Sequence, residues 1–164
     1  MSESDRFEPE GLAHFEGAVD QMEALLQALT SAPCHRVADH PTVPRVPGIY
    51  LFRHEGKPIY VGQSRDLRRR LRYHTRPSSR HNQASFAFNF AKREAFAAGL
   101  DVKRTRSTLA ADVDFAAHFA DALASVAGMS VQFTEIEDPI VRTMFEMYAS
   151  LALGTSEFNS FETH

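Results

Sequence analysis

Residues 46–62, VPGIYLFRHEGKPIYVG, consist of two runs of strand-forming residues on either side of a turn signal that ends in Gly56. A three-residue loop would place Gly56 in the left-handed conformation that a type I turn followed by a bulge requires. This register pairs Tyr50 with Tyr60, so that both tyrosines lie on one face and the aliphatic residues on the other. A two-residue loop would put the tyrosines on opposite faces, because a slip of one residue turns every side chain over. The segment is therefore expected to form a β-hairpin closed by the loop of residues 54–56.

An arginine-rich segment, residues 64–74 (SRDLRRRLRYH), follows the hairpin directly. It is expected to form a helix that begins at Ser64, a residue suited to the N-cap, and ends at about Thr75. Its two leucines mark the buried side of this helix. At about 100° per residue, Arg70 and His74 lie next to that side, whereas the other arginines point further outward. Arg70 is therefore expected to be partly buried against the hairpin.

Three consecutive features resemble, in this order, the signature of the GIY-YIG nuclease family: Gly48-Ile49-Tyr50, Tyr60-Val61-Gly62 and the arginine-rich helix. The resemblance covers roughly residues 46–164. It implies an α/β (α+β) fold in which a small three-stranded antiparallel sheet is flanked by helices. The residues that match the catalytic positions of the family are Tyr50, Tyr60, Arg70, His74, Glu146 and Asn159.

The resemblance further implies a metal-dependent endonuclease that hydrolyses phosphodiester bonds in DNA. Glu146 would hold one divalent cation, Mg²⁺ (or Mn²⁺), which keeps several of its waters. The planar guanidinium of Arg70 suits the scissile phosphate. A tyrosine whose pKa is lowered near a cation would take the proton from water, and we favour Tyr50, with His74 as helper or alternative base. Asn159 would orient a phosphate or the glutamate.

The chain as a whole is not basic, because its formal net charge is −3 and its isoelectric point is about 6.2. A nucleic-acid partner therefore needs a local basic patch, since phosphate binding depends on clustered charge rather than on net charge. Residues 65–80 provide one, with seven arginines and a single acid, Asp66. The alternative to a DNA endonuclease is a catalytically silent nucleic-acid-binding or protein-interaction module on the same fold. The expected DNA-binding residues are Arg65, Arg68, Arg69, Arg72, Arg76, Arg80 and His81.

The chain divides into an N-terminal part, residues 1–45, and an expected nuclease domain, residues 46–164. Apolar residues at helical spacing predict one amphipathic helix over residues 9–31, followed by a proline-rich connector. We expect this helix to pack on the domain, and it is also the surface through which a homodimer would form. Residues 84–128 are interpreted as a helical insertion that shapes substrate choice.

The insertion is expected to contain two helices, over residues 84–98 and 108–127. The third strand is expected over residues 130–136, and the last helix begins after Asp138, a suitable N-cap. Helical periodicity places Glu146 away from the apolar stripe of this last helix, on a solvated side. The catalytic role of Glu146 therefore depends on the family resemblance alone, and Glu135 and Glu137 are less well placed alternatives.

The single cysteine, Cys34, excludes an intrachain disulfide and favours a reducing compartment. No stretch approaches the roughly 18 apolar residues of a membrane span. The acidic segment of residues 2–5 lacks the basic and apolar regions of a signal peptide. The expectation is a cytoplasmic protein that does not associate with membranes.

Overall fold

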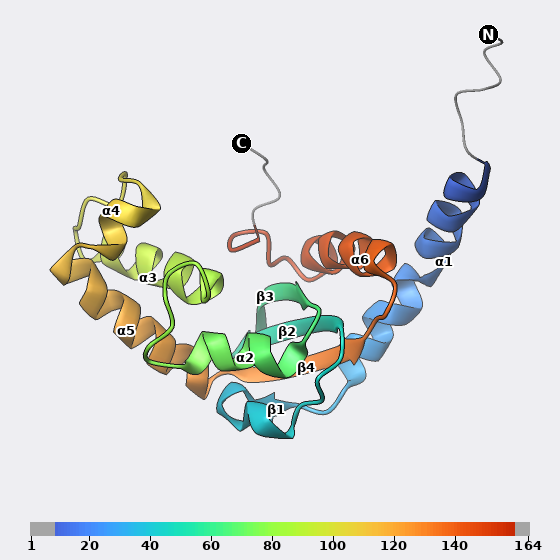
Figure 1. Cartoon of the computed structure of the whole chain (residues 1–164), viewed down its shortest axis with the longest axis horizontal. Helices are drawn as coiled ribbons and strands as arrows, with labels where there is room; N and C mark the ends of the chain where they lie inside the picture. Colours follow the sequence, from blue (N-terminus) through green and yellow to red (C-terminus); the bar gives the residue numbers. More distant parts are fainter. Residues whose placement is uncertain (1–8, 160–164) are drawn as a thin grey trace, which may run out of the picture.

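The structure, a computed structural model, describes residues 9–159 and is built around an antiparallel sheet with the strand order β1–β4–β2–β3 (Figure 1). The strands are β1 (His35–Arg36), β2 (Gly48–His54), β3 (Lys57–Ser64) and β4 (Ser130–Glu135), and a 3₁₀ helix, η2 (Val37–Thr42), follows β1. The expected mixed fold, an antiparallel sheet flanked by helices, is confirmed. The sheet has four strands rather than three, because the connector lays β1 against the start of β4. A two-residue strand is too short to show an alternating pattern in the sequence.

The hairpin of β2 and β3 is closed by two residues, Glu55 and Gly56, and not by the expected three. Their φ angles are 51° and 78°, as a type I′ turn requires. The tyrosines nevertheless share one face, because a bulge next to Phe52 shifts the register so that Phe52 pairs with Tyr60. The predicted common face was therefore right, whereas the predicted loop and the direct pairing of Tyr50 with Tyr60 were wrong.

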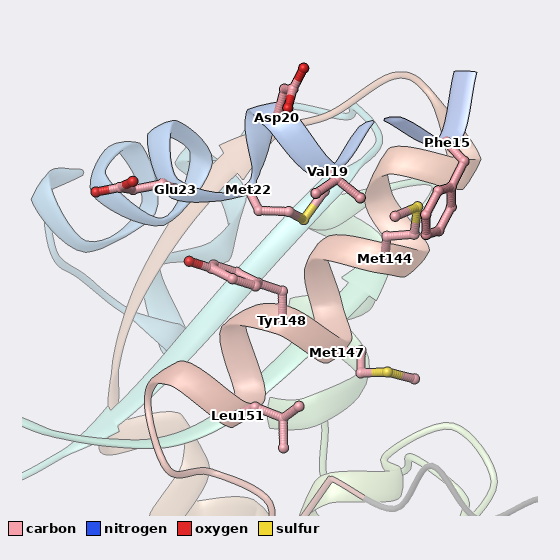
Figure 2. Close-up of a pocket in the computed structure, with 9 residues that line it drawn as sticks. All are labelled: Phe15, Val19, Asp20, Met22, Glu23, Met144, Met147, Tyr148 and Leu151. Carbon is pink, nitrogen blue, oxygen red and sulfur yellow. The ribbon is translucent and has the colours of Figure 1, made fainter. Parts of the chain in front are cut away.

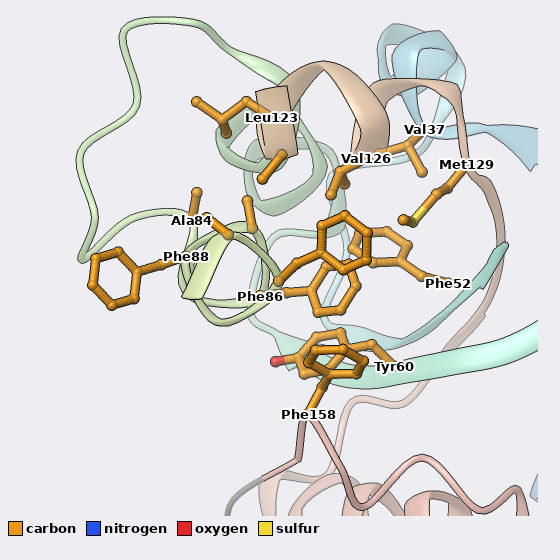
Figure 3. Packing of buried hydrophobic residues seen from close by; sticks show 14 of the residues in the cluster. Val37, Phe52, Tyr60, Ala84, Phe86, Phe88, Leu123, Val126, Met129 and Phe158 are labelled. Carbon is orange, nitrogen blue, oxygen red and sulfur yellow. The ribbon is translucent and has the colours of Figure 1, made fainter. Parts of the chain in front are cut away.

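The two faces of the sheet carry different kinds of side chain. Tyr50, Phe52 and Tyr60 form the aromatic face, which packs against α2 (Leu67–Thr75), α3 (Ser85–Ala97) and α5 (Val113–Gly128) (Figure 3). Ile49, Leu51 and Val61 form the aliphatic face, which packs against α1 (Pro9–Ser31) and α6 (Pro139–Ala152). Because helices cover both faces, the first five residues of β2 are buried regardless of the side to which they point.

Helix α2 begins later than expected, at Leu67. Its N-cap is Asp66, whose carboxylate accepts a hydrogen bond from the backbone nitrogen of Arg69 at 2.9 Å. Ser64 is instead the last residue of β3, and its hydroxyl accepts a hydrogen bond from the backbone nitrogen of Asp66 at 3.0 Å. The helix ends at Thr75, as expected.

The expected helix over residues 84–98 is present as α3. The second helix of the insertion is divided into α4 (Arg106–Ala110) and α5. Between them, the carboxylate of Asp112 accepts hydrogen bonds from the backbone nitrogens of Asp114 and Phe115 and so caps α5. Periodicity alone had placed this cap inside one continuous helix. The last helix, α6, begins after the N-cap Asp138, as expected.

Helix α1 spans the expected residues and packs against α6 of the same chain (Figure 1). A ring nitrogen of His14 lies 2.6 Å from the carboxylate of Asp138 and connects the two helices.

Leu151 is 66% exposed, although it belongs to the apolar stripe of α6. A homodimer through α1 stays a prediction. The groove between the helices, of about 670 Å³, is lined by Phe15, Val19, Asp20, Met22, Glu23, Met144, Met147, Tyr148 and Leu151 (Figure 2).

The described part of the chain contains no helix that could span a membrane. None of the helices between residues 9 and 159 is both long enough and apolar enough to span a bilayer.

Candidate active site

Three side chains on the aromatic face form a hydrogen-bonded group. The hydroxyl of Tyr50 lies 3.0 Å from Nε2 of His74 and accepts a hydrogen bond from Nε of Arg70 at 3.1 Å. Nη1 of Arg70 also donates to the backbone oxygen of Gln83 at 3.0 Å. Tyr50 and His74 are fully buried, whereas Arg70 is half-buried, as expected from its place on α2.

Tyr60 lies beside this group, on the edge strand β3. Its ring stacks on Phe86 of α3 with the ring centroids 4.7 Å apart, and its centroid is 6.1 Å from that of Tyr50. Tyr60 is 9% exposed, whereas Tyr50 has no exposed surface. Of the two tyrosines, only Tyr60 therefore retains contact with solvent.

The glycines of the two sequence motifs leave the space that this packing needs. A Cβ atom on Gly62 would collide with the ring and hydroxyl of Tyr50, which lies across β3. A Cβ atom on Gly48 would collide with the backbone oxygen of Thr134 on the neighbouring strand β4. Both glycines are thus required by close approach and not by an unusual backbone angle.

Burial shifts the pKa values of this group. Burial raises the pKa of Tyr50, although the positive charge of Arg70 acts to lower it. Burial raises the pKa of Tyr60 well above the ordinary value, and the neighbouring Tyr50 raises it further. Burial, followed by the charge of Arg70, lowers the pKa of His74 well below its ordinary value. At neutral pH the protein alone therefore holds two protonated tyrosines beside a neutral imidazole. Burial thus acts against the lowered tyrosine pKa that the sequence analysis expects near a cation.

Glu146 reaches the site from α6, on the other side of the sheet. Its Oε2 accepts a hydrogen bond from Nε2 of Gln63 on β3 at 2.8 Å. The side chain is half-buried and not solvated as expected, because it points at the edge strand. Burial raises its pKa, while hydrogen bonds from Gln63 and the charge of Arg70 lower it. Its charge in turn raises the pKa of Tyr50 and Tyr60, so these groups share one electrostatic environment.

Two residues that the sequence did not single out, Gln63 and Arg142, hold Glu146 in place. Arg142 precedes Glu146 by one helical turn and is only 5% exposed. Its Nη1 donates to the backbone oxygens of Ile136 and Glu137 at 2.9 and 3.2 Å, and its Nε donates to Oε1 of Gln63 at 3.4 Å. Because a guanidinium can only donate, Arg142 binds the carbonyl oxygen of the Gln63 amide. The NH₂ group of the same amide is therefore directed toward Glu146. The position of Arg142, four residues before the matched glutamate, is the sequence signal that could have pointed to it.

Asn159 hydrogen-bonds to the backbone of the edge strand β3. Its Oδ1 accepts from the backbone nitrogen of Val61 at 3.2 Å, and its Nδ2 donates to the backbone oxygen of Val61 at 2.6 Å. The hydroxyl of Thr155 donates to the same Oδ1 at 3.1 Å. These bonds satisfy backbone groups that an edge strand would leave free. In the structure Asn159 therefore holds β3, and its expected contact with a phosphate or the glutamate stays a prediction.

The arginines of the expected DNA surface differ in their exposure. Arg68 is half-buried, and its Nε donates to the backbone oxygen of Val43 at 2.6 Å, so it ties α2 to the connector. The ring of His81 lies beside Phe88 with the centroids 6.0 Å apart, and the backbone oxygen of His81 accepts a hydrogen bond from Arg106. The exposed members are Arg65, Arg69, Arg72, Arg76 and Arg80.

The donor set of this site suits a hard divalent cation that keeps most of its waters. Within residues 9–159, no three His, Cys, Asp or Glu side chains gather closely enough to enclose a metal ion. Glu146 is the carboxylate that shares its surroundings with Arg70 and the tyrosines, and Gln63 bonds only one of its oxygens. One carboxylate with an oxygen left for coordination fits the way in which Mg²⁺ is usually bound.

The family model that matches this chain covers only part of the site. A sequence model described as the GIY-YIG catalytic domain matches residues 46–100. The predicted GIY-YIG resemblance is confirmed. The matched segment contains Tyr50, Tyr60, Arg70 and His74, whereas Glu146 and Asn159 lie beyond it. The description as a catalytic domain agrees with the expectation of an enzyme.

Two individual proteins are similar to parts of the chain. UvrABC system protein C of Deinococcus radiodurans is 47% identical over 36 residues, which are 22% of this chain and 6% of that protein. The chain thus matches a small part of that relative. The crystal structure of the GIY-YIG N-terminal endonuclease domain of UvrC from Thermotoga maritima, a point mutant bound to its catalytic divalent cation, superposes with a TM-score of 0.39 and 16% identity. The superposition covers 74% of this chain and 91% of that chain.

Proposed function

We propose that the chain is a metal-dependent endonuclease that hydrolyses phosphodiester bonds in DNA. The observation that supports this best is that Glu146 shares one electrostatic environment with Arg70, Tyr50 and Tyr60 of the matched GIY-YIG segment. Residues 46–164 would form the nuclease domain, with residues 84–128 as its helical insertion and residues 1–45 as an N-terminal part packed against it.

We assign Arg70 to the scissile phosphate. Phosphodiester hydrolysis requires stabilisation of the charge that develops on the phosphoryl oxygens. Bonds to Tyr50 and to the backbone of Gln83 fix the guanidinium before a substrate arrives, so little reorganisation is needed during the reaction. The exposed arginines of α2 and the following loop would bind neighbouring phosphates through their charge: Arg65, Arg69, Arg72, Arg76 and Arg80.

We assign the proton transfer from water to Tyr60, in place of Tyr50. Tyr50 is fully buried and its hydroxyl is occupied by His74 and Arg70, so a water molecule has no access to it. Tyr60 retains exposed surface and, once ionised, would accept the proton of the attacking water at its hydroxyl oxygen. His74, neutral because of burial, would keep the Tyr50 hydroxyl oriented toward Arg70.

Glu146 would hold the metal ion, with Mg²⁺ or Mn²⁺ as the cation. When bound, such a cation supplies positive charge that favours ionisation of a nearby tyrosine or water and stabilises the departing oxygen. Gln63 and Arg142 keep the carboxylate of Glu146 turned toward the site, and the hydrogen bond from Gln63 favours its ionised form.

A cleavage assay tests the proposal directly. The chain is incubated with labelled duplex, single-stranded and branched DNA, with and without Mg²⁺, as wild type, Glu146→Gln and Glu135→Gln. Glu135 is the matched control because it is an exposed glutamate at the end of β4. Wild type and Glu135→Gln are expected to cut only with Mg²⁺, whereas Glu146→Gln binds DNA without cutting it. Cleavage by Glu146→Gln at the wild-type rate, or binding without cleavage by the wild type, contradicts the proposal.

A further inference from the structure

The helical insertion brings a second guanidinium toward the site. Arg106 is the first residue of α4, and its Nη2 donates to the backbone oxygen of His81. Its guanidinium carbon lies over the ring of Phe88, 4.3 Å from the ring centroid. The loop on one side and the aromatic ring on the other therefore fix the position of this cation.

Arg106 and Arg70 reach the same loop from different helices. Arg70 donates to the backbone oxygen of Gln83, two residues after the His81 oxygen that Arg106 contacts. Burial lowers the pKa of Arg106, and the positive charge of Arg70 lowers it further, so the two guanidinium groups repel each other. Within residues 9–159, neither arginine has a carboxylate within ion-pair distance.

Two half-buried cations that share a loop, with no carboxylate at ion-pair distance, are unfavourable by themselves. Backbone oxygens carry only partial charge and do not neutralise a guanidinium. A phosphate group would, because it accepts several charge-assisted hydrogen bonds from arginine donors at once. The loop that both arginines contact therefore suits an anion that comes from outside the chain.

We propose that Arg106 and the loop of residues 81–83 form, next to Arg70, a subsite for a second phosphate of the DNA backbone. This subsite rests on the proposed function, because it takes Arg70 as the residue on the scissile phosphate. The insertion then contributes to substrate binding and is more than a structural addition to the domain. The competing role for Arg106 is a purely structural tie between α4 and the loop.

Arg104 provides a matched control in the same insertion. It is half-buried like Arg106, but its Nη1 forms an ion pair with the carboxylate of Asp112 at 2.8 Å. Its Nε donates to the backbone oxygen of Asp101 at 3.0 Å. Because a protein carboxylate already neutralises Arg104, no phosphate contact is expected there.

The first experiment measures the salt dependence of DNA binding. Fluorescence anisotropy follows the binding of a labelled duplex in EDTA over a series of KCl concentrations, for wild type, Arg106→Gln and Arg104→Gln. Arg106→Gln is expected to reduce the slope of log K against log [KCl] by about one, the value for one lost phosphate contact. Arg104→Gln is expected to keep the wild-type slope, and thermal melting confirms that each variant is folded.

Equal slopes for folded Arg106→Gln and wild type would overturn the subsite and leave the nuclease proposal intact. Absence of DNA binding by the wild type would instead contradict the nuclease proposal itself. The two failures are therefore distinguishable in the same titration.

A second experiment needs no variant that could fail to fold. The Nε–Hε signals of the arginines are followed by NMR while ¹⁵N-labelled wild-type chain is titrated with a short DNA duplex in EDTA. The signals of Arg106 and Arg70 are expected to shift together, while that of Arg104 stays in place. An Arg106 signal that does not move while the Arg70 signal moves would overturn the subsite.

Discussion

The two faces of the sheet are equally well buried but differ in their chemistry. On the aromatic face, Tyr50, Tyr60 and His74 carry polar groups into the core, and burial shifts the pKa of each of them. On the aliphatic face, the fully buried side chains of the hairpin are the hydrocarbons Ile49, Leu51 and Val61, packed against α1 and α6. Yet the carboxylate of the site, Glu146, comes from α6 on this second face.

The difference shows why the carboxylate enters at the edge of the sheet. A glutamate placed among the buried tyrosines would lose its charge, because burial disfavours the ionised form. At the edge strand β3, Glu146 stays half-exposed and accepts a hydrogen bond from Gln63. The aromatic face thus fixes the hydroxyls and Arg70, while the edge keeps an anion available for a cation.

Among the side chains of the aromatic face, the largest loss of activity is expected from Arg70→Ala. The guanidinium is fixed by Tyr50 and Gln83, and its donors are best used on charge that develops in the transition state. Single-turnover rates at saturating DNA should fall about 100- to 1000-fold, the usual cost of losing one such donor. Binding affinity should change much less.

Arg69→Ala is the control for this prediction, because Arg69 is exposed on the same helix. It should weaken binding and reduce its salt slope by about one, while leaving the single-turnover rate at saturation unchanged. Thermal melting of both variants excludes a packing defect. A wild-type single-turnover rate for folded Arg70→Ala would remove Arg70 from the chemical step.

The next largest effect should separate the two tyrosines of the aromatic face. Tyr60→Phe keeps the ring stacked on Phe86 but removes the accessible hydroxyl, so the cleavage rate should fall about 100-fold or more. Tyr50→Phe removes the acceptor of the Arg70 hydrogen bond inside the core, which should cost about 1–3 kcal/mol of stability. Melting curves and single-turnover rates measure both effects. If Tyr50→Phe abolishes cleavage and Tyr60→Phe does not, the base is Tyr50.

The aromatic face could be predicted from the sequence because strand alternation depends on nearest neighbours along the chain. Tyr50 and Tyr60 were placed on one face correctly, although for the wrong reason. The turn has two residues, and a bulge next to Phe52 restores the alternation that this shorter turn would have broken. A bulge leaves no composition signal, so the turn signal at Glu55–Gly56 did not decide between the two loop lengths, and the three-residue loop was chosen because it alone sorted the faces.

The edge of the site could not be predicted, because it depends on contacts between segments far apart in the chain. Periodicity assigned Leu151 of α6 to the core, but that residue faces solvent, while Arg142 is buried on the same helix. The buried side of α6 is therefore rotated from the apolar stripe, and this rotation turns Glu146 toward β3. Only the packing of α1 and β3 around α6 determines it.

A smaller effect is expected at this edge, from Gln63→Leu. The variant removes the hydrogen bond that lowers the pKa of Glu146, so that burial raises this pKa further. Activity needs the ionised carboxylate and falls as the pH drops through its pKa. The acid limb of the pH–rate profile should therefore move to higher pH, and ¹³C NMR of the Glu146 carboxyl should shift in the same direction. Gln27→Leu, on an exposed position of α1, is the control. If the pH–rate profiles of both variants match that of the wild type, Gln63 does not control the ionisation of Glu146.

The smallest effect concerns stability and tests the buried histidine of the aromatic face. Burial lowers the pKa of His74 well below the ordinary value of 6.5. A group whose folded-state pKa is lowered stabilises the fold above its unfolded pKa, and this stability is lost as the pH falls through that value. The melting temperature of the wild type should therefore drop between about pH 7 and pH 5, by about 2–4 °C for each kcal/mol lost.

In His74→Gln the drop should be smaller, because glutamine does not titrate and still offers polar atoms to Tyr50. His54→Gln, at the exposed end of β2, should keep the wild-type dependence, and an equal drop in all three proteins would show that His74 is not the group that titrates.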